Sequence, residues 1–306
     1  MNKYNDDLEI NIGAVLIKLW QKKLSIIIIT SLFSISAIIF SLLVPNKYIS
    51  SSTLVLSSQL DSAISSLGQD FGGLASLAGI DVGDSGKKDE DLGMEIIKSR
   101  SFFQNLVSFD GVMEQIMAAE SYDFESKKTI FDKKKFIEKD SIWIRKPKPP
   151  YGVEPSYLEA YEEYINELIT IYHDRKSGVV ELSITHVSPV FAYEFSSLII
   201  SQLNILTKEK EIRRTDNALE YLSNESKKVQ NIEVKQSLNK LIEEQLKTKM
   251  ISNMSDEYYF EIIDKPYIPL KKSYPQRSLI VILGTFIGFI SSILFALSRE
   301  FFANFK

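Results

Sequence analysis

Two long uncharged stretches decide the fold: residues 24–44 read LSIIIITSLFSISAIIFSLLV, and residues 279–297 read LIVILGTFIGFISSILFAL. At about 1.5 Å per residue, a helix of either length spans roughly 30 Å, the thickness of the hydrocarbon core of a bilayer. Buried helices of a soluble protein are the alternative, but soluble core helices rarely stay uncharged over such lengths. The sequence therefore predicts two transmembrane helices.

The first apolar segment is longer than the core of a cleaved signal peptide, which usually has about 7–15 apolar residues. The residues that follow it, VPNKYIS, show no small-x-small cleavage pattern. Three lysines stand at residues 18–23, whereas Lys47 alone follows closely, so the positive-inside rule predicts a cytoplasmic N-terminus. The basic residues of 271–277 argue for the opposite orientation, but they carry little weight because they end a long translocated segment.

This topology divides the chain into five parts. Neither tail can bury a core of its own, so we expect no cytoplasmic kinase, cyclase or nucleotide-binding domain. The phosphate-binding pattern GxxxxGK[ST] is also absent from the sequence. The expected parts are a cytoplasmic tail (1–23), a first transmembrane helix (24–44), an outer domain (45–278), a second transmembrane helix (279–297) and a second cytoplasmic tail (298–306).

Composition excludes several kinds of chemistry. The chain has no cysteine, which excludes thiol catalysis, disulfides and thiolate metal sites. Its two histidines, His173 and His186, form no HExxH pair, so we expect neither a metal site nor a cofactor. The net charge of −4 gives no reason to expect a nucleic acid as partner.

The outer domain reads as α+β. β-forming and alternating residues predict strands at 47–57, 178–187 and 257–263. A Ser/Gly-rich loop containing GGLASLAGI (72–80) follows the first strand, and RKPKPPYGVEP (145–155) predicts a second loop. The lysines of 127–135 are expected on a solvated helix face, although they could also meet an anionic polymer. Apolar spacing predicts helices over 94–103, 112–119, 127–138 and 155–174.

A much longer helix is expected after the second strand. Ser188 and Pro189 form a helix start, and no proline or glycine follows as far as Asn253. A continuous helix over 189–253 would measure roughly 100 Å. It must either project as one rod or break near 223–231 and fold back as a hairpin. Either form leaves a narrow apolar stripe that favours self-association.

Small residues recur at every fourth position of the second apolar segment, as in GxxxG helix packing. Chance is the alternative, because glycine and serine are common in membrane helices. Four consecutive small positions favour a packing face, and the first segment has a weaker equivalent in Thr30, Ser34 and Ser41. The four positions are Gly284, Gly288, Ser292 and Ala296.

The arrangement resembles the polysaccharide co-polymerases, the Wzz-type chain-length determinants of the bacterial inner membrane. The segment before the second span is the most specific: Pro266-x2-Pro269-x4-Tyr274-Pro275 parallels a family motif that has serine where Tyr274 stands. The other matching phrases are DLEINIGAVLIKLWQKKLSIIII (Asp7–Ile29), VPNKYISSSTLVL (Val44–Leu56), GGLASLAGI and GVVELSITHVSPVFA (Gly178–Ala192).

The resemblance implies a membrane-proximal α/β base in the periplasm, a long projecting helix and a ring-like homo-oligomer. It also implies a regulator of O-antigen or related polysaccharide length that acts with a membrane polymerase and has no catalytic residues. Contact with the growing polysaccharide would fit this role. Some relatives carry a tyrosine kinase domain, and we expect none here. We expect the prolines and the small-residue face to transmit contacts to the polymerase, with a plain rigid linker and ordinary helix packing as the alternative.

Three other functions fit parts of the sequence. A glycosidase needs only a positioned carboxylate pair, but no further motif supports an enzyme. A sensor would fit two spans and an outer domain, but it would need an output domain in the cytoplasm. A periplasmic scaffold or adaptor subunit of a polysaccharide export complex is the strongest alternative, because such subunits also use long helices and oligomers.

Overall fold

A computed structural model describes residues 20–57 and 85–303. Residue contacts divide the chain into two compact units. The apolar unit contains the residues up to Asn46 and those from Ser273 onward, and the outer unit contains Lys47–Lys272. Most of the predicted Ser/Gly-rich loop, 57–88, including its GGLASLAGI phrase, lies outside the described residues, and its last residues, from Ser85, are helical.

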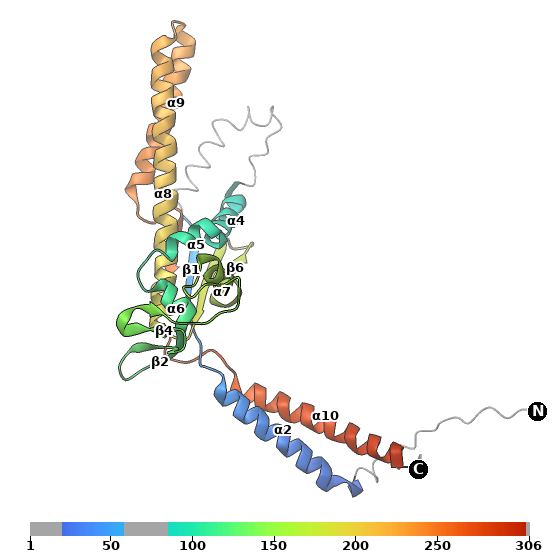
Figure 1. The fold of residues 1–306 in the computed structure, drawn as a ribbon. Helices are drawn as coiled ribbons and strands as arrows, with labels where there is room; N and C mark the ends of the chain where they lie inside the picture. The colour runs from blue at the N-terminus through green and yellow to red at the C-terminus, as the bar shows by residue number, and fades with distance from the viewer. Residues whose placement is uncertain (1–19, 58–84, 304–306) are drawn as a thin grey trace, which may run out of the picture. The chain divides into compact units, whose positions relative to one another are not determined.

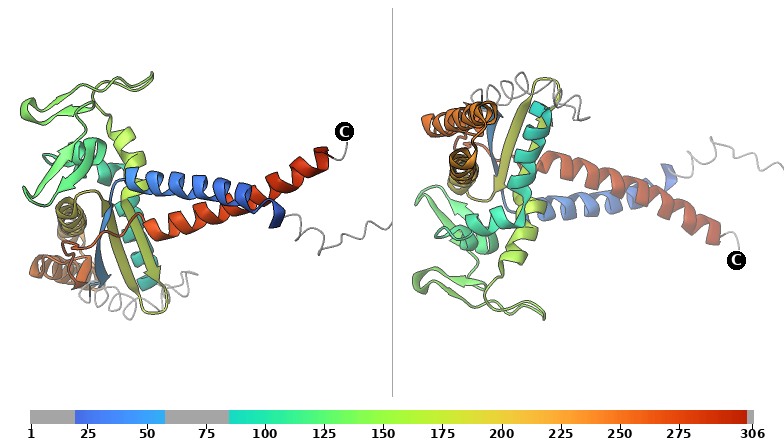
Figure 2. Two further views of the ribbon diagram at one scale, coloured as in Figure 1. Left: turned by 90° about the horizontal axis from the view of Figure 1, so that it is seen from below. Right: turned by 90° about the horizontal axis from the view of Figure 1, so that it is seen from above.

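The apolar unit consists of two helices, α2 (Lys23–Leu43) and α10 (Arg277–Ala303), which pack side by side (Figure 2). Among the described residues, three helices are long and apolar enough to cross a membrane: α2, the Arg277–Ser298 part of α10, and α8 (Pro189–Lys228) of the outer unit. Length and composition alone thus give one more candidate than the sequence analysis expected.

The outer unit is built on a four-stranded antiparallel sheet in the order β6 (Ile169–Asp174), β7 (Val179–His186), β1 (Tyr48–Leu56) and β8 (Phe260–Asp264) (Figure 1). The strands predicted at 47–57 and 178–187 are confirmed. The last strand begins later than predicted, because the backbone N–H groups of Tyr259 and Phe260 first bond to a helix side chain, Asn204.

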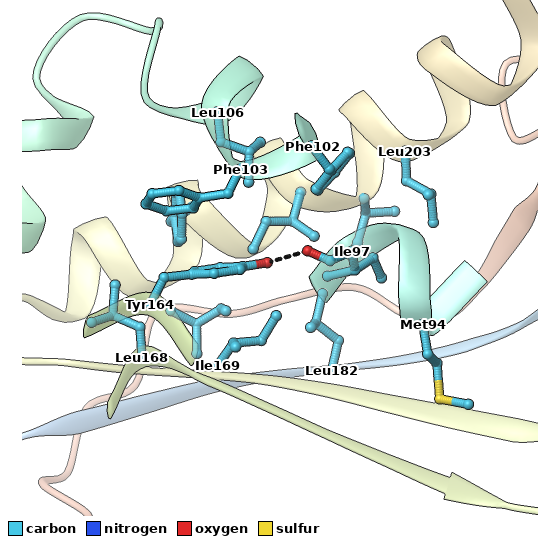
Figure 3. Close-up of a cluster of buried hydrophobic side chains, with 14 of the residues drawn as sticks. Met94, Ile97, Phe102, Phe103, Leu106, Tyr164, Leu168, Ile169, Leu182 and Leu203 are labelled. Carbon is cyan, nitrogen blue, oxygen red and sulfur yellow. Dashed lines mark hydrogen bonds between the residues drawn. The ribbon is translucent and has the colours of Figure 1, made fainter. Parts of the chain in front are cut away.

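One face of this sheet is apolar and packs against helices. In β7 every second residue, from Val180 to His186, is buried, as the alternation predicts. Figure 3 shows part of the cluster, in which the Tyr164 hydroxyl donates a 3.0 Å hydrogen bond to the Ile97 carbonyl oxygen. The covering helices are α4 (Ser85–Lys98), α5 (Arg100–Leu106), α6 (Val112–Ala118), α7 (Tyr157–Glu163) and the first part of α8.

The long helical region forms a hairpin (Figure 1), so a continuous rod is wrong. α8 has 40 residues, about 60 Å, and ends at Lys228. Val229 is extended, and the Asn231 side chain then caps α9 (Ile232–Met254) by accepting hydrogen bonds from two backbone N–H groups. Lys249 and Asp216 form a 2.6 Å ion pair between the two helices. The N-cap at Ser188 with Pro189 in the first turn is confirmed.

The helix predicted over 127–138 is wrong. The chain instead forms two small hairpins, from β2 (Ala119–Asp123) to β3 (Lys128–Phe131) and from β4 (Phe136–Ile137) to β5 (Ile142–Trp143). A short 3₁₀ turn, Glu138–Asp140, connects β4 and β5. Turn chemistry overrides helix propensity here, because the Asp123 carboxylate accepts the N–H groups of Glu125 and Ser126 and Lys127 takes a left-handed φ of 54°.

The helix predicted over 155–174 is only half right. α7 ends at Glu163, the π-helical turn Tyr164–Leu168 follows, and residues 169–174 form β6. Leu158 and Tyr172 contribute to the apolar spacing that predicts this helix, but both are exposed. The sequence ITIY at 169–172 is rich in β-forming residues and pairs with residues 181–184 of β7. The region predicted as one helix over 94–103 is divided at Ser99, which ends the α4 segment and caps α5.

Candidate functional site

The small residues of α10 lie where this helix meets α2. A Cβ atom added to Gly284 would overlap the Cβ of Ala37, and one added to Gly288 would overlap the Cβ of Phe33. Ser292 and Ala296 are buried on the same face. The structure thus brings the four predicted residues together along one contact in which only glycine allows so close an approach at the first two positions.

Polar groups cross the same contact. Thr285 donates from its hydroxyl to the Ser34 hydroxyl oxygen at 3.1 Å, and Thr30 donates to the Ser292 hydroxyl oxygen at 3.4 Å. Near the other end, the Lys22 ammonium donates to the Ala296 carbonyl oxygen at 3.1 Å. Thr30 and Ser34 of α2 therefore face α10. Ser41 is also buried, but its hydroxyl bonds to the Ile38 carbonyl of its own helix.

The three predicted prolines are divided between the two units. Pro266 and Pro269 are buried in the outer unit, whereas Pro275 is half-buried and belongs to the apolar unit. The Ser50 hydroxyl of β1 donates a 2.7 Å hydrogen bond to the Tyr267 carbonyl oxygen, between the first two prolines. This bond ties the proline segment to the sheet, because Ser50 is itself fully buried.

A cleft of about 700 Å³, which the sequence does not predict, lies between α8 and residues 256–266. Ser197 and Asn204 line it from α8, and Lys208 donates hydrogen bonds to the Ser255 carbonyl oxygen at 3.0 Å and to the Asp256 carboxylate at 3.3 Å. The cleft thus combines hydroxyl, amide and charged groups of both signs. The one feature of the sequence that points to this cleft is the spacing of Ser197 and Ser201, because residues four apart lie on the same face of a helix.

Buried titratable groups of the outer unit are held by structural bonds. His186 accepts the Ser188 N–H at Nδ1, so its neutral ring carries the proton on Nε2 and donates it to the Gln115 carbonyl oxygen at 2.9 Å. Burial lowers the pKa of His186 to about 4. The ring therefore joins β7 to α6 in its neutral form.

A short ion pair lies at the start of α7. Arg145 bonds to Glu159 at 2.7 Å, and this hydrogen bond lowers the pKa of the Glu159 carboxyl. The same carboxylate accepts the Ser156 N–H and so completes the cap of α7. Over residues 20–57 and 85–303 there is no group of three or more histidine, aspartate or glutamate side chains placed to hold a metal ion.

Fold and site together define an α+β protein that has a long helical hairpin on its outer unit and two tightly packed apolar helices. Residues 8–108 match the family described as chain length determinant protein, which confirms the resemblance to the Wzz-type proteins. Residues 228–301 match a second family, GNVR, a G-rich domain described on tyrosine kinases.

Two solved structures of polysaccharide co-polymerases are similar to this chain. One is a full-length bacterial polysaccharide co-polymerase with 13% identity, covering 95% of this chain and 98% of its own, with a TM-score of 0.40. The other is a fragment of WzzB, the polysaccharide co-polymerase from Salmonella Typhimurium, with 12% identity, 75% and 100% coverage, and a TM-score of 0.31. No curated protein sequence matches this chain.

Proposed function

We propose that this protein is a non-enzymatic regulator of the chain length of a surface polysaccharide, O-antigen or a related lipopolysaccharide or exopolysaccharide. The match of residues 8–108 to the chain length determinant family carries this proposal. In this role the protein is an oligomeric scaffold in the inner membrane that works with the membrane polymerase.

The proposed topology keeps both tails, 1–23 and 298–306, in the cytoplasm and residues 45–278 in the periplasm. α2 and α10 cross the membrane. Most of their large apolar side chains are exposed, and only lipid would shield them from water. The lysines at 18–23 support the orientation.

α8 is not a span in this proposal, although it is long and apolar enough to be one. Phe195, Ile199 and Leu203 are almost fully buried in the core of the outer unit. Charged residues follow at 208–214, and a charge within the hydrocarbon core costs several kcal/mol.

Self-association of the outer unit is supported by the helical hairpin. The hairpin exposes several large apolar side chains to solvent, and contact with a second copy of the chain would bury them. They include Tyr221, Ile232, Val234, Leu246, Met250 and Met254.

Contact with the polymerase is proposed to pass through the apolar unit. Gly284, Gly288, Ser292 and Ala296 hold α10 against α2, and this rigid pair presents its outward faces to a membrane partner. The proline segment 266–275 stiffens the connection to the outer unit.

The direct test is deletion of the gene in a strain that makes the polymer, followed by gel analysis of polysaccharide chain lengths. We expect loss of the preferred length and its recovery with the wild-type gene. Recovery should fail with Gly284→Leu/Gly288→Leu but not with Ile282→Leu/Ile287→Leu, which changes exposed positions of the same helix. An unchanged ladder in the deletion strain would refute the proposal, and loss of all surface polymer would favour the export scaffold.

A further inference from the structure

The two small hairpins of the outer unit have no role in the function proposed above. We call residues 119–143, which contain β2–β3 and β4–β5, the double hairpin. Figure 1 shows it at the end of the outer unit opposite the tip of the α8–α9 hairpin, and Figure 2 shows both hairpins projecting from the side of this unit.

Acidic and basic residues balance over the whole double hairpin, but positive charge is concentrated from Lys127 onward. Residues 127–148 contain nine lysines and arginines but only three acidic residues, in a chain whose net charge is −4. Arg145 is neutralised by Glu159, and the Lys135 ammonium bonds to the Met117 carbonyl oxygen. The remaining lysines of this stretch are exposed. The charge is therefore directed to solvent.

Large apolar side chains are exposed beside these lysines. Exposure of such a side chain to water is unfavourable, and its burial against another apolar surface would be stabilising. Together with the lysines they form an amphipathic surface, with apolar groups and cations interleaved. The apolar members and their exposed fractions are Phe124 (54%), Ile130 (43%), Ile137 (38%), Ile142 (53%) and Ile144 (38%).

A cleft of about 470 Å³ lies between the two hairpins. Lys128, Lys133 and Lys139 line it together with Ile130 and Ile137. Glu138 also lines the cleft, so three cations face one carboxylate. This excess of positive charge suits an anionic phosphate group, and the isoleucines suit an adjoining apolar chain.

Chain connectivity limits how far this surface can lie from the first apolar helix. The Phe124 ring, at the tip of the first hairpin, packs edge-on against Tyr48 with ring centroids 5.7 Å apart. Tyr48 follows Leu43, the last residue of α2, by five residues, which span at most about 18 Å when fully extended. Where α2 leaves a bilayer, this short connection permits the tip of the hairpin to reach the headgroup layer.

We propose that the double hairpin docks on anionic phospholipid headgroups of the bilayer that the apolar helices cross. Lysines bind the phosphates, and the exposed isoleucines and Phe124 enter the interfacial layer. An anionic polysaccharide would satisfy the lysines but would leave the isoleucines in water. The Asp123 carboxylate does not oppose docking strongly, because it bonds to the Ser126 hydroxyl and to backbone N–H groups within the turn. The inference rests on the membrane topology of the proposed function.

The cysteine-free chain allows a direct test. Ile130→Cys or Ile142→Cys places a single thiol on either hairpin of the full-length protein, and Gln230→Cys at the tip of the α8–α9 hairpin serves as the control. Each is labelled with an environment-sensitive fluorophore and reconstituted into vesicles. One set contains phosphatidylcholine alone, and the other contains about a third phosphatidylglycerol. Nitroxide-headgroup lipids then report contact through quenching.

We expect quenching at residues 130 and 142 in the anionic vesicles, little in the neutral ones, and none at residue 230. Lys128→Gln/Lys133→Gln/Lys139→Gln should weaken docking on the order of 100-fold, since each lysine near an anionic surface contributes about fivefold. Lys235→Gln/Lys240→Gln/Lys247→Gln on α9 removes the same charge from exposed positions and should change nothing. High salt should release the double hairpin.

Equal quenching in neutral and anionic vesicles, or none in either, would overturn the proposal. So would a fluorescence change on adding a soluble anionic polysaccharide together with no lipid quenching, because the surface would then bind polymer. Circular dichroism checks that each variant is folded. The polysaccharide ladder of the deletion strain is a separate measurement, so failure of lipid docking leaves the length-regulator proposal standing.

Discussion

α8 and the pair α2–α10 are all long and apolar enough to cross a membrane, yet their surroundings differ. In the most apolar window of each helix, 44% of the α8 residues are buried within the protein, compared with 6% for α2 and 17% for α10. α8 uses its apolar stripe as one wall of the outer core, where Phe195 and Leu203 meet the sheet and the neighbouring helices. All three helices meet the length and apolarity that a membrane span needs, but only α8 has a sheet and neighbouring helices that cover its apolar face.

The largest effect is expected from removing a core side chain of α8. Phe195→Ala should destabilise the outer unit by about 3–5 kcal/mol, because the side chain is 1% exposed and leaves a cavity. Phe40→Ala on α2, where the side chain is 60% exposed, should cost about 0.5 kcal/mol or less. Urea unfolding of the full-length protein in detergent, followed by circular dichroism, measures both. Equal losses would break the distinction between the helices.

The second test uses acid. His186 has a folded pKa of about 4 against 6.5 for a free histidine, so the unfolded state binds a proton first as the pH falls. Stability of the outer unit should fall by about 3 kcal/mol between roughly pH 6.5 and 4, while the apolar unit is unaffected. Urea midpoints across this range report the loss. His186→Gln should be less stable at pH 7.5 but should lack this part of the pH dependence, and an unchanged slope would contradict the assignment.

A smaller effect is expected at the contact between α2 and α10. Gly284→Leu/Gly288→Leu inserts side chains where Ala37 and Phe33 already lie, at a cost of about 1–3 kcal/mol. Disulfide cross-linking between cysteines placed at Ser34 and Thr285, whose hydroxyl oxygens are 3.1 Å apart, reports the pairing. Cross-linking should fall in the leucine variant. If the yield stays at the wild-type level, the small-residue face does not determine how the helices pack.

The smallest effect concerns the far end of α8. Asn231→Ala removes the cap of α9 and should cost about 1 kcal/mol. Asn239→Ala, at an exposed position inside α9, should be neutral or slightly stabilising because alanine favours helix. Hydrogen exchange of the hairpin tip separates the two variants. Equal exchange rates would show that the cap does not hold the tip.

Regular patterns in the sequence predicted the regular parts of the fold. Alternation located β7, and Ser188 with Pro189 located the start of α8. The helix predicted over 127–138 failed because side-chain bonds of Asp123 and the left-handed Lys127 created turns that no periodicity reveals. The prediction of a helix over 155–174 was wrong for residues 169–174, because these residues pair with β7 and form the strand β6. The sequence alone does not show that β7 has a free edge.

The candidate site shows the same division. The fourfold spacing of Gly284 and Gly288 located a face of α10, but the side chains opposite them, Ala37 and Phe33, follow only from the relative register of two distant helices. The cleft beside Lys208 depends on the return of the chain after α9, which sequence spacing does not locate. The spacing of residues in the sequence thus predicts which face of a helix is in contact, but the residues on the other side of that contact are known only from the tertiary structure.

The Asn204 side chain of α8 binds the chain where it returns from the helical hairpin. Its amide oxygen accepts the N–H groups of Tyr259 and Phe260, and its amide nitrogen donates to the Phe260 carbonyl oxygen, so the start of β8 is fixed to α8. The hairpin is therefore a spacer whose length is independent of its base. Matched insertions in α8 and α9 would lengthen the hairpin by about 1.5 Å per residue pair, while the same three hydrogen bonds still close it at the base. Hairpins of different lengths can therefore be built on the same sheet.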